Sequence, residues 1–185
     1  MRQRVDQQRI ELFLQRLGRQ FNKPGRVYLV GGTTMVYEGL REQTLDIDLA
    51  LEIANEDHSA FIAAVRELKE KLSLNIEEAS PADFIPLPAG YRERSQFIGR
   101  YGQLDVFHFD LYSTALSKIE RGNESDFTDV LSLLQTERLE MAKLVQYFHE
   151  ILLRYATESL KQDPIEFQRK FAILTDMWRD MSTRN

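Results

Sequence analysis

The sequence contains no cysteine and only five prolines in 185 residues. The absence of cysteine excludes disulfide frameworks, thiolate nucleophiles and zinc sites with cysteine ligands. No apolar run approaches the roughly 20 residues that a membrane-spanning helix needs. The N-terminal stretch MRQRVDQQRIELF also lacks the uninterrupted apolar segment of a signal peptide. We therefore expect a soluble, cytoplasmic protein with no membrane partner.

An excess of positive charge is also missing, because the formal net charge is −5. A field of this sign argues against a protein that coats DNA or RNA generally. A local basic patch that holds one RNA stays possible, and the arginine-bearing stretch YRERSQFIGR at residues 91–100 leaves that alternative open.

The chain is 43% hydrophobic, which is enough for a buried core, and its pattern changes near residue 110. Before that point, strand-like runs alternate with helical ones; after it, the periodicity is helical. The expected strands are residues 26–30, 45–53 and 74–79, together with a hairpin within 95–109. The expected helices include 4–21, 112–121, 125–135 with a serine cap, and 136–160. Two further helices are expected, one that is capped by Asp57 or Ser59 and runs through Leu72, and one that begins at Asp163 and Pro164. This order predicts the α+β class, with a mixed β-sheet flanked by helices in a lobe at 1–110 and a C-terminal helical lobe at 111–185.

Two aspartates interrupt an otherwise apolar strand in LDIDLALEI. Asp46 and Asp48 are two residues apart, so they point to the same face of the strand at a spacing of about 6.6 Å. Two carboxylates so placed repel each other unless a cation lies between them. Mg²⁺ prefers a few carboxylate oxygens together with substrate phosphates, and two ions about 4 Å apart can clamp both oxygens of a phosphoryl transfer.

A glycine pair, Gly31 and Gly32, ends the preceding strand and opens a helix. Without side chains, these residues let a phosphate approach free N–H groups at the helix start. Alone, such a pair is usually only a turn, and an Asp-x-Asp strand is usually a solvated face. The joint arrangement of strand, glycine turn, helix and acidic strand favours a metal–nucleotide site.

This joint pattern resembles the nucleotidyltransferase superfamily, whose members share the palm of DNA polymerase β. Gly31, Gly32 and Thr33 match the glycine turn of that superfamily, and Asp46 and Asp48 match its Asp-x-Asp pair. The resemblance implies two Mg²⁺ ions, a nucleoside triphosphate cradled by the turn, and a third acidic ligand on a later strand. Asp105 in QLDVFHF fits that third position best, and Asp110 is the alternative.

The stretch REQTLDIDL also resembles AbiEii-type toxins and their uncharacterised relatives, and so does HFDLYSTALSKIERGNESDFTDVLSLL downstream. The resemblance, which covers about residues 27–134, implies that Lys118 reaches the triphosphate and that Asp129 takes part in binding the nucleotide. It also suggests an RNA acceptor, such as the 3′ end of a tRNA, and an antitoxin partner. Each role has a plainer alternative. Lys118 can be an exposed helix lysine, and Asp126 can be an acid that only stabilises the first turn of its helix. Arg41 and Arg121 can be arginines that contact no phosphate.

We therefore expect a metal-dependent nucleotidyltransferase in which Asp46, Asp48, Asp105 and Lys118 are catalytic and Gly31, Gly32, Thr33, Arg41 and Asp129 bind the nucleotide. His108 has no second ligand at metal spacing, and a core or supporting histidine is favoured over a catalytic base. Two rival hypotheses are a non-catalytic binding or regulatory module that keeps the fold, and a purely structural domain.

Overall fold

The computed structural model describes residues 4–158 and 163–183. The contacts within the chain divide it into two compact units, one of Met1–Ser80 with Ser95–Phe109 and one of Pro81–Arg94 with Asp110–Asn185. The segment Pro81–Arg94 therefore belongs to the same unit as the C-terminal helices. The functional division at residue 110 into a palm-like lobe and a helical lobe stays a prediction.

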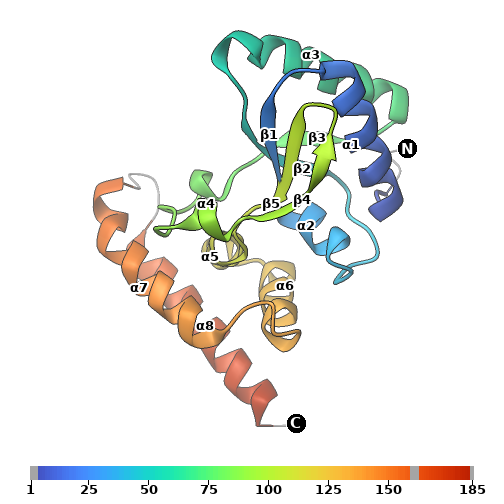
Figure 1. The fold of residues 1–185 in the computed structure, drawn as a ribbon. Helices are drawn as coiled ribbons and strands as arrows, with labels where there is room; N and C mark the ends of the chain where they lie inside the picture. Colours follow the sequence, from blue (N-terminus) through green and yellow to red (C-terminus); the bar gives the residue numbers. More distant parts are fainter. Residues whose placement is uncertain (1–3, 159–162, 184–185) are drawn as a thin grey trace. The chain divides into compact units, whose positions relative to one another are not determined.

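The first unit is a mixed five-stranded sheet flanked by helices, as predicted for the α+β class (Figure 1). Its elements are α1 (Gln7–Phe21), β1 (Gly25–Leu29), α2 (Gly31–Tyr37), β2 (Ile47–Glu52), α3 (Asn55–Leu72), β3 (Ile76–Glu78), β4 (Gln96–Tyr101) and β5 (Leu104–His108). The strand order is β3-β2-β1-β5-β4. β1 pairs antiparallel with β2 and parallel with β5, β3 is parallel to β2, and β4 and β5 form the predicted hairpin.

Strand alternation gives this sheet two different faces. One face carries apolar side chains that share a single core with α1 and α3: Val27, Leu29, Ile47, Leu49, Leu104 and Val106. Phe13, Leu17 and Phe61 of the two helices are among the side chains that fill this core. The opposite face carries Asp48 of β2, Tyr28 of β1 and Asp105 of β5. The core thus fixes which way the functional candidates point.

The second unit consists of a 3₁₀ turn at Pro81–Asp83 and the helices α4 (Tyr91–Arg94), α5 (Leu111–Arg121), α6 (Glu124–Gln135), α7 (Met141–Glu158) and α8 (Pro164–Ser182). Aromatic stacking joins α7 to α8, with ring centroids 3.8 Å apart for Phe148 and Phe171. The predicted cap of α8 is confirmed, because the Asp163 carboxylate accepts a hydrogen bond from the Ile165 N–H at 2.8 Å.

Several predicted element boundaries were wrong. β2 begins at Ile47, and Leu45 lies outside the strand with 65% of its surface exposed. α3 begins at Asn55 after Ala54, and α6 at Glu124 after Asn123, in both cases without a side-chain cap. Acidic residues in both first turns supply favourable charge instead. α7 starts at Met141, five residues later than predicted, and its predicted end at 159–160 lies outside the described residues.

Within the described ranges, no helix is long and apolar enough to span a bilayer.

Candidate nucleotide and metal site

The glycine turn lies directly against the carboxylate of Asp48. Gly31 has a φ of +57°, and a Cβ atom there would lie 2.7 Å from Asp48 Oδ2. Val30 also donates its N–H to the Asp48 carbonyl oxygen at 3.2 Å. A left-handed φ and a contact this close both require glycine. The end of β1 and the start of β2 are therefore joined at the position where the sequence places its two motifs.

The loop between α2 and β2 folds back over the same turn. A Cβ atom on Gly32 would lie 2.6 Å from Thr44 Oγ1 and 3.8 Å from Arg41 Nη1. Arg41, predicted from its position in REQTLDIDL, thus lies beside the turn with a half-buried side chain. The glycine pair, Arg41 and Thr44 form one surface around the turn. Thr44 was not predicted, although it occupies the Thr position of the quoted motif.

Thr33 holds the acidic strand to the start of α2. Its Oγ1 accepts a hydrogen bond from the Asp48 N–H at 2.8 Å and donates one to the Asp46 carbonyl oxygen at 3.4 Å. The Thr33 residue is fully buried. In this structure it therefore fixes the backbone of both aspartates.

Asp46 has a partner directly before β3 that was not predicted from the sequence. The buried Asn75 amide donates hydrogen bonds to Asp46 Oδ1 and, at 2.8 Å, to Glu77 Oε1. The β2–β3 register sets Asp48 opposite Glu77, so Asn-Ile-Glu at 75–77 lies beside Asp-Ile-Asp at 46–48. The repeated polar-Ile-polar pattern was the available sign in the sequence, but its meaning depends on a strand pairing that the sequence does not state.

Asp105, the predicted third carboxylate, lies on the same face of the sheet as Asp48 but far along it. It is opposite Arg26 on β1, whereas Asp48 is bonded to Val30, four residues further along that strand. At 3.3 Å per residue the separation along the strand is about 13 Å. Arg100 instead binds the Asp105 carboxylate at 2.7 and 3.0 Å, which lowers the pKa of that carboxyl group. The structure does not bring Asp105 together with Asp46 and Asp48.

Asp110, the alternative, belongs to the second unit and is engaged there. Its carboxylate caps α5 by accepting from the Ser113 N–H at 3.1 Å, and it binds the Arg94 guanidinium at 3.0 and 2.9 Å. These hydrogen bonds explain why an acidic residue is buried here, because Asp110 serves as the N-terminal cap of α5.

The donor chemistry of Asp46 and Asp48 suits Mg²⁺, which takes carboxylate oxygens and completes its shell with water and phosphate oxygens. Across residues 4–158 and 163–183, no group of three or more histidine, aspartate or glutamate side chains is already arranged to hold a metal ion. The pair therefore fits a cation that arrives with its phosphate ligands rather than one held in a complete protein cage.

Lys118, Asp126 and Asp129 come together in the second unit. Lys118 is 3% exposed, and its Nζ lies 2.7 Å from Asp129 Oδ2 and 3.4 Å from Asp126 Oδ1. Arg121 adds a contact to Asp126 Oδ1 at 2.6 Å. The alternative prediction, that Lys118 is an exposed helix lysine, was wrong. The predicted contact of Lys118 and Asp129 with a nucleotide stays a prediction.

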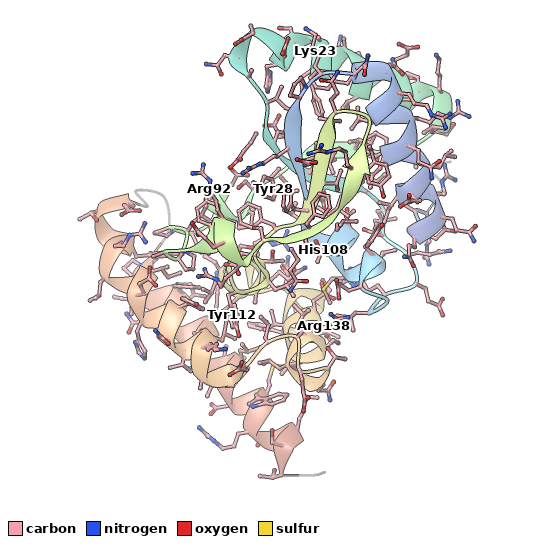
Figure 2. The ribbon with its side chains drawn as sticks, in the orientation of Figure 1. Lys23, Tyr28, Arg92, His108, Tyr112 and Arg138 are labelled. Atoms are coloured by element: carbon pink, nitrogen blue, oxygen red, sulfur yellow. The ribbon has the colours of Figure 1, made fainter. Side chains whose placement is uncertain are left out.

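His108 is a buried residue at the end of β5 (Figure 2). Its Nε2 lies 3.0 Å from Glu38 Oε1, at the end of α2, and its ring packs edge-on against Tyr37 at 5.4 Å. This placement confirms the expected core or supporting histidine. The pair joins the helix that starts at the glycine turn to the central sheet.

Comparison with known proteins agrees with this geometry. No curated protein and no solved structure matches the chain. Residues 8–176 match the family described as "Nucleotidyltransferase of unknown function (DUF6036)". That match includes residues of both units, all five strands of the sheet and the whole of the site described above. The chain belongs to this family of the nucleotidyltransferase superfamily.

Proposed function

We propose that this protein transfers a nucleoside monophosphate from a nucleoside triphosphate to an acceptor hydroxyl group. The observation that carries the proposal is the contact between the glycine turn and the Asp48 carboxylate, with Asp46 fixed beside it. A glycine turn beside two carboxylates supplies the kinds of donor that a metal-bound triphosphate requires.

In this proposal Asp46 and Asp48 hold Mg²⁺, and two ions are expected by resemblance to the superfamily. When bound, Mg²⁺ neutralises the triphosphate oxygens and stabilises charge on the attacking and leaving oxygens. Gly31 and Gly32 give the β and γ phosphates access to the backbone. Arg41, beside Gly32, adds a forked donor that suits phosphate oxygens.

The reaction breaks the bond between the α-phosphorus and the bridging oxygen of pyrophosphate. The acceptor hydroxyl oxygen forms the new bond to the α-phosphorus in line, and its proton passes to solvent. Positioning and charge dominate such transfers, so a dedicated base is unnecessary. His108 therefore stays outside the chemistry and supports the position of α2.

The third acidic position is assigned to Glu77 rather than to Asp105. The Asn75 amide contacts both Asp46 and Glu77, so their two acceptor oxygens lie within about 5 Å of each other, a spacing compatible with neighbouring ligands in a two-metal site. The register separates Asp105 from Asp48 by about 13 Å along the strand direction alone, and β1 lies between their strands.

Further parts of the proposal rest on the resemblance to AbiEii-like proteins. Lys118 and Asp129 contact the triphosphate or its metal, the acceptor is an RNA such as a tRNA 3′ end, and an antitoxin restrains the activity. A second candidate is a non-catalytic module of the same family.

The test is transfer of label from α-labelled nucleoside triphosphates, with Mg²⁺, to total cellular RNA or protein. Wild type should label an acceptor, Asp48→Asn should not, and the exposed control Glu56→Gln should match wild type. Circular dichroism verifies that each variant is folded. Equal labelling by folded Asp48→Asn would refute the catalytic role of the pair, and no labelling together with no triphosphate binding would favour the non-catalytic module.

A further inference from the structure

Asn75 is a buried residue whose amide contacts two carboxylates of the candidate site. It lies directly before β3 and is 4% exposed. Its side-chain nitrogen donates to Asp46 Oδ1 and, at 2.8 Å, to Glu77 Oε1. A carboxylate only accepts hydrogen bonds, whereas the amide nitrogen carries two N–H groups. One N–H is therefore available for each carboxylate, and the side chain uses its full donor capacity here.

The backbone around Asn75 is fixed by hydrogen bonds on both sides. The Leu74 N–H donates to the Lys69 carbonyl oxygen, at the end of α3, at 3.1 Å. The Asn75 carbonyl oxygen accepts from the Ile47 N–H of β2 at 2.8 Å. Because the asparagine side chain is short, this backbone also fixes where the amide lies. The two carboxylates are therefore held against a donor that is itself held in place.

The two carboxylates are close together without a positively charged partner. Neither Asp46 nor Glu77 forms an ion pair with any residue that the structure describes. The buried carboxylate of Asp110, by contrast, is bound by Arg94. Because Asp46 and Glu77 share one donor atom, their accepting oxygens lie within about 5 Å of each other, a separation at which like charges repel. A neutral group thus holds together two charges that no side chain compensates.

A neutral donor is the kind of group that suits the ligands of a cation. A lysine or arginine at this position would compensate the two carboxylates itself and repel an incoming ion. Hydrogen-bond donors behind metal ligands orient those ligands, and their loss typically costs about 10- to 100-fold in metal affinity. We propose that Asn75 is a positioning residue, which orients the Asp46 and Glu77 carboxylates for the divalent cation that accompanies the triphosphate. The inference rests on the proposed function in taking these two carboxylates as cation ligands.

The test measures the binding of Mn²⁺, which takes the same carboxylate, carbonyl and water ligands as Mg²⁺. Free Mn²⁺ is counted by electron paramagnetic resonance with the full chain, first without nucleotide and then with a non-hydrolysable triphosphate. Asn75→Leu, which has nearly the same shape but no donor, should weaken Mn²⁺ binding by about 10- to 100-fold. Asn55→Leu, the same substitution at an exposed asparagine of α3, should bind Mn²⁺ as wild type does.

Asn75→Asp distinguishes positioning of the cation ligands from a merely structural role. This variant keeps the shape of the side chain but replaces the donor with a negative charge, which attracts a cation bound beside it. It should therefore bind Mn²⁺ more tightly than wild type does, and it decides the question alone if circular dichroism shows that Asn75→Leu does not fold. Equal Mn²⁺ affinities of wild type and folded Asn75→Leu, with only the stability to urea lowered, would overturn the proposal. Weaker binding by Asn75→Asp than by wild type would also overturn it.

The outcome can be separated from that of the transferase assay. Mn²⁺ binding that is weakened in Asn75→Leu, in a protein whose wild type transfers no label, would sustain the role of Asn75 and refute the proposed transfer. Label transfer with the same Mn²⁺ dependence in wild type and Asn75→Leu would sustain the transfer and refute the role of Asn75.

Discussion

Gly31 combines a left-handed backbone with a carboxylate pressed against its Cα, since a Cβ atom there would lie 2.7 Å from Asp48 Oδ2. Any side chain must either move the carboxylate or distort the turn. Glycine at this position therefore has two effects: it permits the left-handed turn, and it leaves room for the Asp48 carboxylate.

Gly31→Ala is expected to lower the free energy of unfolding by more than the roughly 1–2 kcal/mol that a left-handed alanine costs, because it adds a clash to the backbone strain. It should also weaken Mg²⁺-dependent triphosphate binding by displacing Asp48. Urea unfolding measures the first effect, and titration with triphosphate measures the second.

Gly39 supplies the matched control for this prediction. Its φ is +73°, but a Cβ atom there would meet nothing within 4 Å. Gly39→Ala should lower the free energy of unfolding only by the cost of a left-handed alanine, and it should bind triphosphate as wild type does. Similar losses of stability and binding in the two variants would show that the contact with Asp48 is unimportant.

At this scale the sequence predicts residues whose role comes from nearby positions in the chain. The proximity of the glycine pair to Asp46 and Asp48 was predictable because these residues are close in the sequence. Asn75 and Glu77 were not, because their importance arises only when β3 pairs with β2 in the observed register. Asp105 illustrates the same limit, because its position along the sheet depends on how β5 pairs with β1.

Helices α5 and α6 are joined by a buried network of opposite charges. Lys118 of α5 contacts both Asp126 and Asp129 of α6, and all three residues are almost fully buried. Asp126 Oδ2 has no hydrogen-bond partner, although it is shielded from solvent. Lys118 is the only cation among these three residues, so the network depends on it.

Lys118→Met should lower the free energy of unfolding by about 3–5 kcal/mol, because it leaves two buried carboxylates without their lysine partner. Denaturant unfolding followed by circular dichroism measures the change. Lys143→Met, which removes an exposed lysine paired with Glu140, is the control and should leave stability unchanged. A wild-type stability for Lys118→Met would contradict the structural role of the network.

Secondary-structure elements were predicted best where apolar periodicity was strong. The strands of the sheet, the hairpin and the cap at Asp163 are confirmed. Helix starts were less predictable, because α3 and α6 begin after residues that make no side-chain cap. Leu45 was also misplaced, because it lies between the isolated bridge of Thr44 with Val5 and the start of β2 at Ile47.

For the whole molecule, family membership narrows the chemistry without naming the substrate. The family match covers residues 8–176, and a shared fold hosts both active and inactive members in general. With a net charge of −5, the protein gains little from long-range attraction to nucleic acid. In the proposed function, recognition of an acceptor therefore depends on local surfaces rather than on the net charge.

The central claim is that Asp46 and Asp48, beside the glycine turn, bind a metal-bound triphosphate. Calorimetric titration tests it most directly because it needs no knowledge of the acceptor. A non-hydrolysable triphosphate is titrated into wild type, Asp48→Asn, Glu77→Gln and the control Glu56→Gln, with and without Mg²⁺. The account predicts binding by wild type and Glu56→Gln only when Mg²⁺ is present, no binding by Asp48→Asn, and weakened binding by Glu77→Gln. Binding that is independent of Mg²⁺, or equal in wild type and Asp48→Asn, would contradict it.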